Sequence, residues 1–228
     1  MRGELLPYSS SVNLKGAKPE KFGSFASRLY RRWAEPMCAP LHRRIGAEVP
    51  IEHGRLLDVG CGPGRLDRLL AAARPELQVV GIDVSPDMIT QAGYGPSLPN
   101  LSFCVGSSEE PRFENEFDFA IAVLTFHHWE EPVAGLAGVH RALKPGGRFW
   151  IFEGDPDAPA IELTRDRAPL WGWLSLPVFL MRRAMRHHGF SRDEIESTVR
   201  EAIAESPFRS ANVSQTGSTF RIELEKTA

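Results

Sequence analysis

A glycine-rich segment between an apolar strand and an amphipathic helix constrains the fold of this chain more than any other feature. Residues 55–59 (RLLDV) predict a short strand, and residues 60–64 (GCGPG) place three glycines before a helix predicted over 65–73. The apolar residues of that helix recur at i, i+3, i+4 and i+7, which is the spacing of one helix face: Leu66, Leu69, Leu70 and Ala73. Glycines permit a tight turn and let a ligand approach the backbone, and the helix start presents free N–H groups. The segment therefore predicts a strand–loop–helix unit that binds a ligand.

The rest of the chain repeats this alternation of strands and helices. Further strands are predicted at 78–82, 101–105, 117–124 and 148–153, and further helices at 86–92 and 132–143. A helix over 191–206 begins with the capping-box pair Ser191 and Glu194, and strands near 208–214 and 219–224 are expected to form a hairpin at Gly217. Strands that alternate with helices predict a doubly wound α/β fold with a mostly parallel sheet. We expect seven strands, with the antiparallel hairpin at the C-terminal end.

The same reading divides the chain into four expected parts. A helix predicted over 25–46 is expected to break or kink at Pro36 and Pro40, because proline lacks the N–H that a helix interior needs. Residues 1–54 are expected to form an N-terminal arm with a helical cap, and residues 55–154 the ligand-binding core. Residues 155–190 are expected to form a lid or cap insertion, and residues 191–228 a helix with strands that complete the core.

Composition narrows the class of partner. The net charge of -2 argues against general electrostatic capture of nucleic acid. No apolar run approaches the roughly 18–20 residues that span a bilayer, and no secretory apolar region follows Met1, so we expect no membrane span. Three cysteines without CxxC spacing favour a reducing, cytoplasmic location: Cys38, Cys61 and Cys104.

An acidic residue supports a nucleoside-like ligand. Asp83 ends the second predicted strand about 20 residues after the glycine segment, where a carboxylate accepts hydrogen bonds from a ribose hydroxyl pair. The glycines follow a GxGxG spacing, whereas dinucleotide dehydrogenases use GxGxxG. This spacing suits a ligand whose ribose carries an amino-acid chain.

Four segments together resemble a known family. Residues 55–153 resemble class I S-adenosylmethionine (SAM)-dependent methyltransferases, especially the group that contains ubiquinone and menaquinone biosynthesis methyltransferases. The segments are LLDVGCGPG (56–64), VVGIDVSPDMI (79–89), FDFAIAVLTFHHW (117–129) and HRALKPGGRFWIFE (140–153). The resemblance implies a Rossmann-like fold, methyltransferase activity and SAM as the cofactor.

The resemblance also implies roles for individual residues in cofactor binding. Asp83 would hold the ribose, Val84 and Met88 would enclose the adenine, and Tyr30 would close over the cofactor from the N-terminal helix. Ser107 and Ser108 stand where the family often has an aspartate that binds the adenine amino group. The remaining predicted contacts line the methionine part and the neighbouring loop: Asp58, Gly60, Cys61, Gly62, Gly64 and Leu124.

Methyl transfer from a sulfonium is an in-line displacement that needs a general base only when the acceptor must lose a proton. His127 and His128 follow the fourth predicted strand, where ligands of open α/β sheets bind, and are the predicted catalytic residues. A packing role for either histidine is the open alternative. The predicted substrate contacts are Trp129, Glu153, Trp171 and Trp173. Packing is the alternative for the tryptophans, and a place in a solvated loop is the alternative for Glu153. His187 and His188 lack metal-ligand spacing, and we expect no metal site.

The leading hypothesis is a methyltransferase acting on O, N, S or C of a small molecule. An RNA-modifying enzyme is a second hypothesis, in which a basic face is formed by the late run 182–188 and five arginines: Arg28, Arg31, Arg32, Arg43 and Arg44. A non-catalytic SAM-binding regulator is a third. An NAD(P) dehydrogenase is disfavoured by the GxGxG spacing and by the KPGG segment at 144–147. No sequence feature indicates an oligomeric state.

Overall fold

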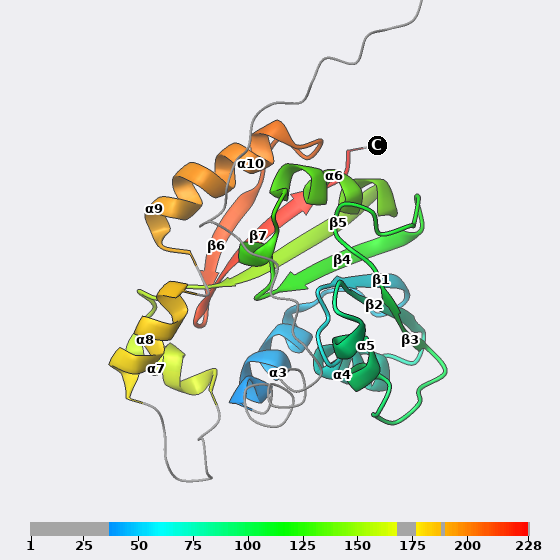
Figure 1. Ribbon diagram of the computed structural model, residues 1–228, viewed down its shortest axis with the longest axis horizontal. Helices are drawn as coiled ribbons and strands as arrows, with labels where there is room; N and C mark the ends of the chain where they lie inside the picture. Colours follow the sequence, from blue (N-terminus) through cyan, green and yellow to red (C-terminus); the bar gives the residue numbers. More distant parts are fainter. Residues whose placement is uncertain (1–36, 168–176, 188–189, 228) are drawn as a thin grey trace, which may run out of the picture.

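A seven-stranded mixed sheet organises the chain (Figure 1). The computed structural model describes residues 37–167, 177–187 and 190–227. The strand order is β3-β2-β1-β4-β5-β7-β6, in which β1 to β5 run parallel and β7 is antiparallel to both β5 and β6. The strands are β1 (Gly54–Val59), β2 (Leu77–Asp83), β3 (Leu101–Val105), β4 (Phe117–Val123), β5 (Leu143–Gly154), β6 (Asn212–Thr216) and β7 (Thr219–Glu225). The predicted doubly wound, Rossmann-like α/β fold with a C-terminal hairpin is confirmed.

Helices cover both faces of the sheet because the inner strands are apolar on both sides. Leu57 of β1 packs in the cluster shared with α6 (Pro132–Ala142) and the C-terminal helices, whereas its neighbour Leu56 packs in the cluster shared with α3 (Ala39–Glu48) and α4 (Arg65–Ala73). The C-terminal helical segment consists of α9 (Arg192–Glu194), a π-helical turn (Ile195–Val199) and α10 (Arg200–Glu205). A further helix, α5 (Pro86–Ala92), contacts β2 and β3.

Local signals in the sequence account for several element boundaries. The Ser85 hydroxyl caps α5 by accepting a hydrogen bond from the Met88 N–H, and Ser191 and Glu194 form the predicted capping box. Gly217 turns the hairpin with a φ of 55°. Pro40 lies in the first turn of α3, where its missing N–H costs nothing, so it does not kink that helix.

Other boundaries differ from the predictions. The helix α6 ends before Lys144 as expected, but β5 begins at Leu143 instead of Arg148, because Leu143 pairs with Phe117 across a register shift. The first hairpin strand begins at Asn212, later than predicted, because Phe208 is buried in the core.

The predicted lid region contains two helices that its sequence did not reveal. The helices α7 (Ala160–Arg165) and α8 (Val178–His187) pack on a small separate cluster: Ala158, Leu163, Met181 and Met185. Helices this short carry too few turns for a clear apolar period. The division of the chain into four parts stays a prediction.

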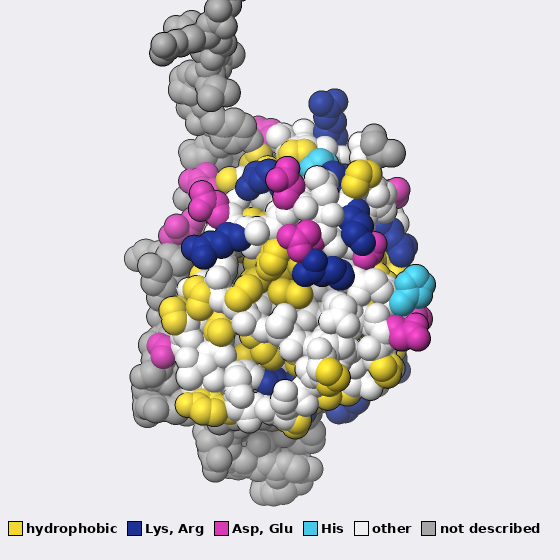
Figure 2. All heavy atoms as spheres, turned by 90° about the vertical axis from the view of Figure 1, so that its right-hand side faces the viewer, with side chains coloured by type: hydrophobic (Ala, Val, Ile, Leu, Met, Phe, Trp, Pro, Cys, Tyr) yellow, Lys and Arg dark blue, Asp and Glu magenta, His cyan; other side chains and the backbone are white. Residues whose placement is uncertain are grey.

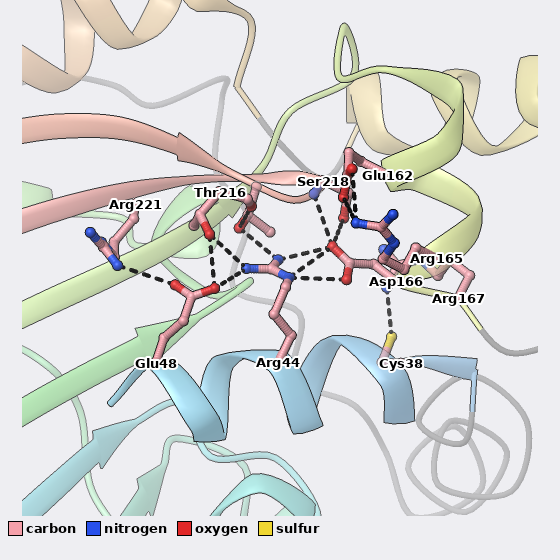
Figure 3. Close-up of polar contacts among 11 residues, drawn as sticks. Cys38, Arg44, Glu48, Glu162, Arg165, Asp166, Arg167, Thr216, Ser218 and Arg221 are labelled. Atoms are coloured by element: carbon pink, nitrogen blue, oxygen red, sulfur yellow. Dashed lines mark hydrogen bonds and ion pairs between the residues drawn. The ribbon is translucent and has the colours of Figure 1, made fainter. Parts of the chain in front are cut away.

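A polar network ties α3 to the end of α7 and to the C-terminal hairpin (Figure 3). The guanidinium of Arg44 donates to both carboxylate oxygens of Asp166, at 3.0 Å from Nε to Oδ1 and 2.9 Å from Nη2 to Oδ2. It also donates to Glu48 at 2.7 Å and to the Thr219 hydroxyl at 3.1 Å. Ser218 donates its N–H and its hydroxyl to Asp166, which is buried. Five residues from α3, the end of α7 and the C-terminal hairpin therefore converge at one point.

Asp166 is the central anion of this network. Burial alone would raise its pKa, but the hydrogen bonds from Arg44 and Ser218 hold the pKa of Asp166 below its usual value. A carboxyl whose pKa is lowered by folding stabilises the fold above its unfolded-state pKa, and this contribution is lost as the pH falls through the lowered value.

We expect Asp166→Asn to lower the free energy of unfolding by on the order of 2–3 kcal/mol at pH 7, because it leaves the Arg44 charge without its buried partner. The matched control is Glu162→Gln, which removes only the surface ion pair with Arg165 and should cost less than about 1 kcal/mol. Denaturant titration of both variants measures the difference. Equal stability of the two variants would contradict the central role of Asp166.

Candidate active site

The direction of the chain connections changes between the neighbouring strands β1 and β4, so the helices that follow these two strands lie on opposite faces of the sheet. In open α/β sheets, ligands bind beyond the carboxyl ends of strands at such a switch point. The loop after β1 holds Gly60, and a Cβ atom added there would lie 2.3 Å from the Thr125 hydroxyl in the loop after β4. The two loops therefore touch, and together they form the candidate site.

The three glycines of the first loop have different physical roles. Gly60, Gly62 and Gly64 all have positive φ angles, of 83°, 54° and 75°. A Cβ on Gly64 would lie 2.4 Å from the Phe103 ring, so packing alone requires glycine there, as it does at Gly60. Among the described residues, nothing lies within 4 Å of the Cβ position at Gly62. Gly62 therefore offers open space beside its backbone, which fits a ligand that contacts the loop directly.

Asp83 connects this loop to the start of α5. Its Oδ2 accepts the Gly62 N–H at 3.0 Å, and its Oδ1 accepts the Ser85 N–H at 2.8 Å. Burial raises the pKa of Asp83, although these two hydrogen bonds oppose the shift. A carboxylate has about four acceptor sites, so capacity remains for a pair of ligand hydroxyls.

The residues predicted to contact an adenine differ in their exposure and in the contacts that they already make. Val84 is 49% exposed beside the loop, whereas Met88 is buried. The Ser107 hydroxyl accepts the Glu110 N–H at 3.2 Å, and Ser108 is buried against α6, where its carbonyl would meet a Cβ on Gly138. These two serines are thus already engaged within the protein, and their contact with a ligand stays a prediction.

Beneath the loop lie two buried carboxyls, one of which the sequence did not single out. Asp58 ends β1 with its Oδ1 unpartnered among the described residues. Asp67, in the first turn of α4, is fully buried next to it, and Cys61 lies beside both. The signal for Asp67 was available, since position 67 belongs to the helix turn that follows the glycine loop, but its polarity suggested exposure.

A histidine–glutamate pair lies at the ends of β4 and β5. His127 sits in the 3-10 turn η2 (Phe126–His128), and its Nδ1 is 2.8 Å from Oε2 of Glu153. The His127 backbone N–H also donates to Oε1 of Glu153 at 3.3 Å. Glu153 is fully buried and His127 is 5% exposed. The carboxylate therefore fixes the imidazole ring from its Nδ1 side.

This pairing was not predicted, although both residues were. Glu153 contacts His127, and its expected contact with a substrate stays a prediction. The link could have been found from topology, because β4 and β5 are parallel neighbours and their carboxyl ends meet.

The other predicted site residues surround this pair or lie outside the described residues. The His128 ring centroid is 3.9 Å from that of His127, and the Leu124 backbone has a positive φ of 53°. Trp129 is buried between Phe126 and Phe149, which suits packing, and its contact with a substrate stays a prediction. Three predicted residues fall outside the part of the chain that the structure describes: Tyr30, Trp171 and Trp173.

A separate groove of about 340 Å³ lies at the other end of α4. It lies between α3 and α4, and its lining includes His42, Arg43, Leu69 and Arg74. None of these residues belongs to the loops that form the candidate site.

Comparison with known protein families gives a direct match to the core. Residues 57–151 match the family model described as "Methyltransferase domain". A ubiquinone biosynthesis O-methyltransferase of Xanthomonas campestris is 30% identical over 156 residues, which cover 64% of this chain and 64% of that protein. A trans-aconitate 2-methyltransferase of Methylobacterium radiotolerans is 32% identical over 120 residues, covering 52% of this chain and 45% of that protein. The chain thus spans less than two thirds of these relatives.

Solved structures share the fold at low sequence identity. Human N-acetylserotonin methyltransferase superposes with a TM-score of 0.66 at 16% identity, covering 93% of this chain and 61% of that one. A SAM-dependent methyltransferase from Aquifex aeolicus gives a TM-score of 0.60 at 19% identity, covering 91% of this chain and all of that one (100%).

The glycine loop at the switch point, the acidic residue at the end of β2 and the match over residues 57–151 agree. These findings support a class I SAM-dependent methyltransferase domain over residues 57–151, with S-adenosylmethionine as its cofactor.

Proposed function

We propose that this chain transfers the methyl group of SAM to a small molecule whose attacking atom must lose a proton. The buried pair of His127 and Glu153 at the ends of β4 and β5 carries this proposal. The names of two relatives support a small acceptor, since one acts in ubiquinone biosynthesis and one on trans-aconitate.

The first loop suits the cofactor. SAM supplies a methyl group that is bound to a positively charged sulfur. The sulfur leaves as a neutral thioether, so it needs no proton from an acid. Gly62 would lie against the cofactor because its Cβ position is open, and Asp83 would bind the ribose hydroxyls with its remaining acceptor capacity. Val84 would cover the adenine with its exposed side chain, and Asp58 would face the amino-acid end.

The histidine would act on the acceptor. Glu153 would accept a hydrogen bond from the Nδ1–H group of His127, which leaves Nε2 of His127 as the basic nitrogen. The carboxylate also stabilises the imidazolium that forms when Nε2 takes a proton. Such a base suits an O–H or N–H acceptor, and a carbon nucleophile only if it too must lose a proton.

The RNA-modifying alternative receives less support. Arg44, which that hypothesis places on a phosphate-binding face, is bound to Asp166 and Glu48. On the face in Figure 2, Lys and Arg side chains of the described residues alternate with Asp and Glu, so no continuous basic patch forms there. Three arginines that the RNA hypothesis assigns to the basic face lie outside the described residues: Arg28, Arg31 and Arg32.

Two features bear on location. Among the described residues, no helix has the length and apolar character that crossing a membrane requires. The chain has three cysteines without CxxC spacing, which supports the proposal of a reducing cytoplasm.

We expect Asp83→Asn to raise the Kd for SAM by about 10–100-fold, because it removes a charged acceptor worth roughly 1.5–3 kcal/mol. Asp87→Asn is the matched control, since Asp87 lies nearby in the first turn of α5 and has no hydrogen bond to the loop among the described residues. Calorimetric titration with SAM measures the Kd of both variants. A parallel titration with NAD tests the dehydrogenase alternative. Wild-type affinity in Asp83→Asn would refute the ribose role.

We expect His127→Asn to lower kcat by about 10²–10⁴-fold while the Kd for SAM changes by less than about twofold, because a general base acts only on the chemical step. Glu153→Gln should lower kcat by a smaller factor. The acceptor is first identified by mass spectrometry after incubation with methyl-labelled SAM and a small-molecule extract. The control His53→Asn alters an exposed histidine and should keep wild-type kcat. Undiminished turnover in His127→Asn would mean that His127 only packs.

A further inference from the structure

Two buried carboxyls meet beneath the glycine loop. Asp58 of β1 is in register with Gly81 of β2, so both positions project to the sheet face that α4 covers. A Cβ on Gly81 would lie 2.8 Å from Oδ1 of Asp67 and 2.9 Å from the Cβ of Cys61. The Asp67 carboxyl therefore lies on the bare backbone of β2, directly beside Asp58.

Arg68 brings a positive charge near Asp67, but it forms no hydrogen bond with this carboxyl. Neither oxygen of Asp67 receives a hydrogen bond of ordinary geometry, and neither does Oδ1 of Asp58. The nearest cation, Arg68, donates instead to backbone carbonyls, namely those of Pro63, Gly64 and Ala92. Two buried acidic side chains thus lie side by side beneath the loop.

The other ionisable groups around the pair do not supply a positive charge. Asp83 faces it from β2 and adds a third carboxyl, while its own hydrogen bonds go to backbone N–H groups. Cys61 faces it from the loop, and burial with the neighbouring carboxyls raises the pKa of that thiol. Cys104 of β3 lies behind Cys61, and burial raises its pKa as well.

Two like charges in a dry site cannot both be formed at low cost, so one carboxyl keeps its proton. Burial first, and then the charges of Asp67 and Asp83, hold the pKa of Asp58 well above its usual range. Burial raises the pKa of Asp67 to about 7, although the Arg68 charge opposes this shift.

We infer that Asp58 and Asp67 share one proton in the ligand-free protein, and that the ammonium group of the cofactor's amino-acid end replaces this proton on binding. The incoming positive charge makes the doubly ionised pair favourable, and the displaced proton passes to the buffer. Cofactor binding is therefore linked to the release of a proton. The inference rests on the proposed cofactor site and deepens it by assigning a partner to Asp67.

The test is titration calorimetry with SAM in buffers of different ionisation enthalpy, which counts the protons released. With a pKa of about 7, the wild type should release about 0.8 proton at pH 6.5. The affinity should rise about eightfold from pH 5.5 to 6.5, a range in which the ligand's own amino group stays protonated. Methylthioadenosine, which lacks the amino-acid end, should bind without releasing a proton.

Asp67→Asn is the decisive variant, because an amide of the same shape donates to Asp58 without carrying a titrating proton. It should bind SAM with almost no proton release and with an affinity that is flat from pH 5.5 to 6.5. Asp193→Asn, on exposed α9, should behave as the wild type. Thermal unfolding gives a second readout of the shared proton: the wild type should lose stability as the pH rises from 5 to 8, because the unfolded chain ionises first, and Asp67→Asn should lose less.

SAM binding without proton release, or release that persists in Asp67→Asn, would overturn the inference and leave the proposed cofactor site standing. Release with methylthioadenosine would also overturn it, because the displaced proton would then not depend on the ammonium. Absence of SAM binding to the wild type would instead remove the proposed function itself.

Discussion

A single carbonyl fixes the candidate site. The Ile82 oxygen at the end of β2 accepts the N–H groups of both Gly60 and Cys61, at 2.8 and 2.9 Å. This contact bends the chain sharply as it leaves β1, which places Gly60 against Thr125 and leaves space beside Gly62. Since both partners are backbone atoms, the arrangement depends on the pairing of β1 with β2 and on the positive φ angles that glycine permits.

The site that results separates two kinds of acid–base chemistry. On the side of β1 and β2, two buried carboxyls lie side by side, so they favour a ligand that brings positive charge. On the side of β4 and β5, Glu153 is buried against an imidazole that it orients. The first arrangement suits a cationic methyl donor and the second suits an acceptor that must lose a proton. The boundary between them is the contact between the two loops, where the methyl group would pass.

Parts of the fold with strong local signals were predictable from the sequence. The extents of α4, α5 and β3 agree with the structure because their apolar spacing and caps are local properties. The glycine loop between β1 and α4, and the position of Asp83 at the end of β2, were predictable for the same reason, since both follow from local sequence spacing. The two short helices of the lid region were not, because their apolar side chains pack in a small cluster around Leu163 that is separate from the main core.

Contacts between distant segments were also beyond local signals. The pairing of His127 with Glu153 follows from the strand order, and the burial of Asp67 follows from the bare backbone at Gly81. Arg44 looked like part of a basic surface, yet it is the partner of Asp166, which is 122 residues away in the chain. The sequence shows the type of each of these residues, but their partners are determined by the way the sheet folds.

The central claim is that SAM lies in the open space beside Gly62, and its most direct test is an amide NMR titration of the full chain with SAM. The account predicts that the largest shifts fall on the N–H groups of Gly62 and Val84 and spread to His127. Shifts centred instead on the groove between α3 and α4, at Arg43 and Leu69, would contradict it.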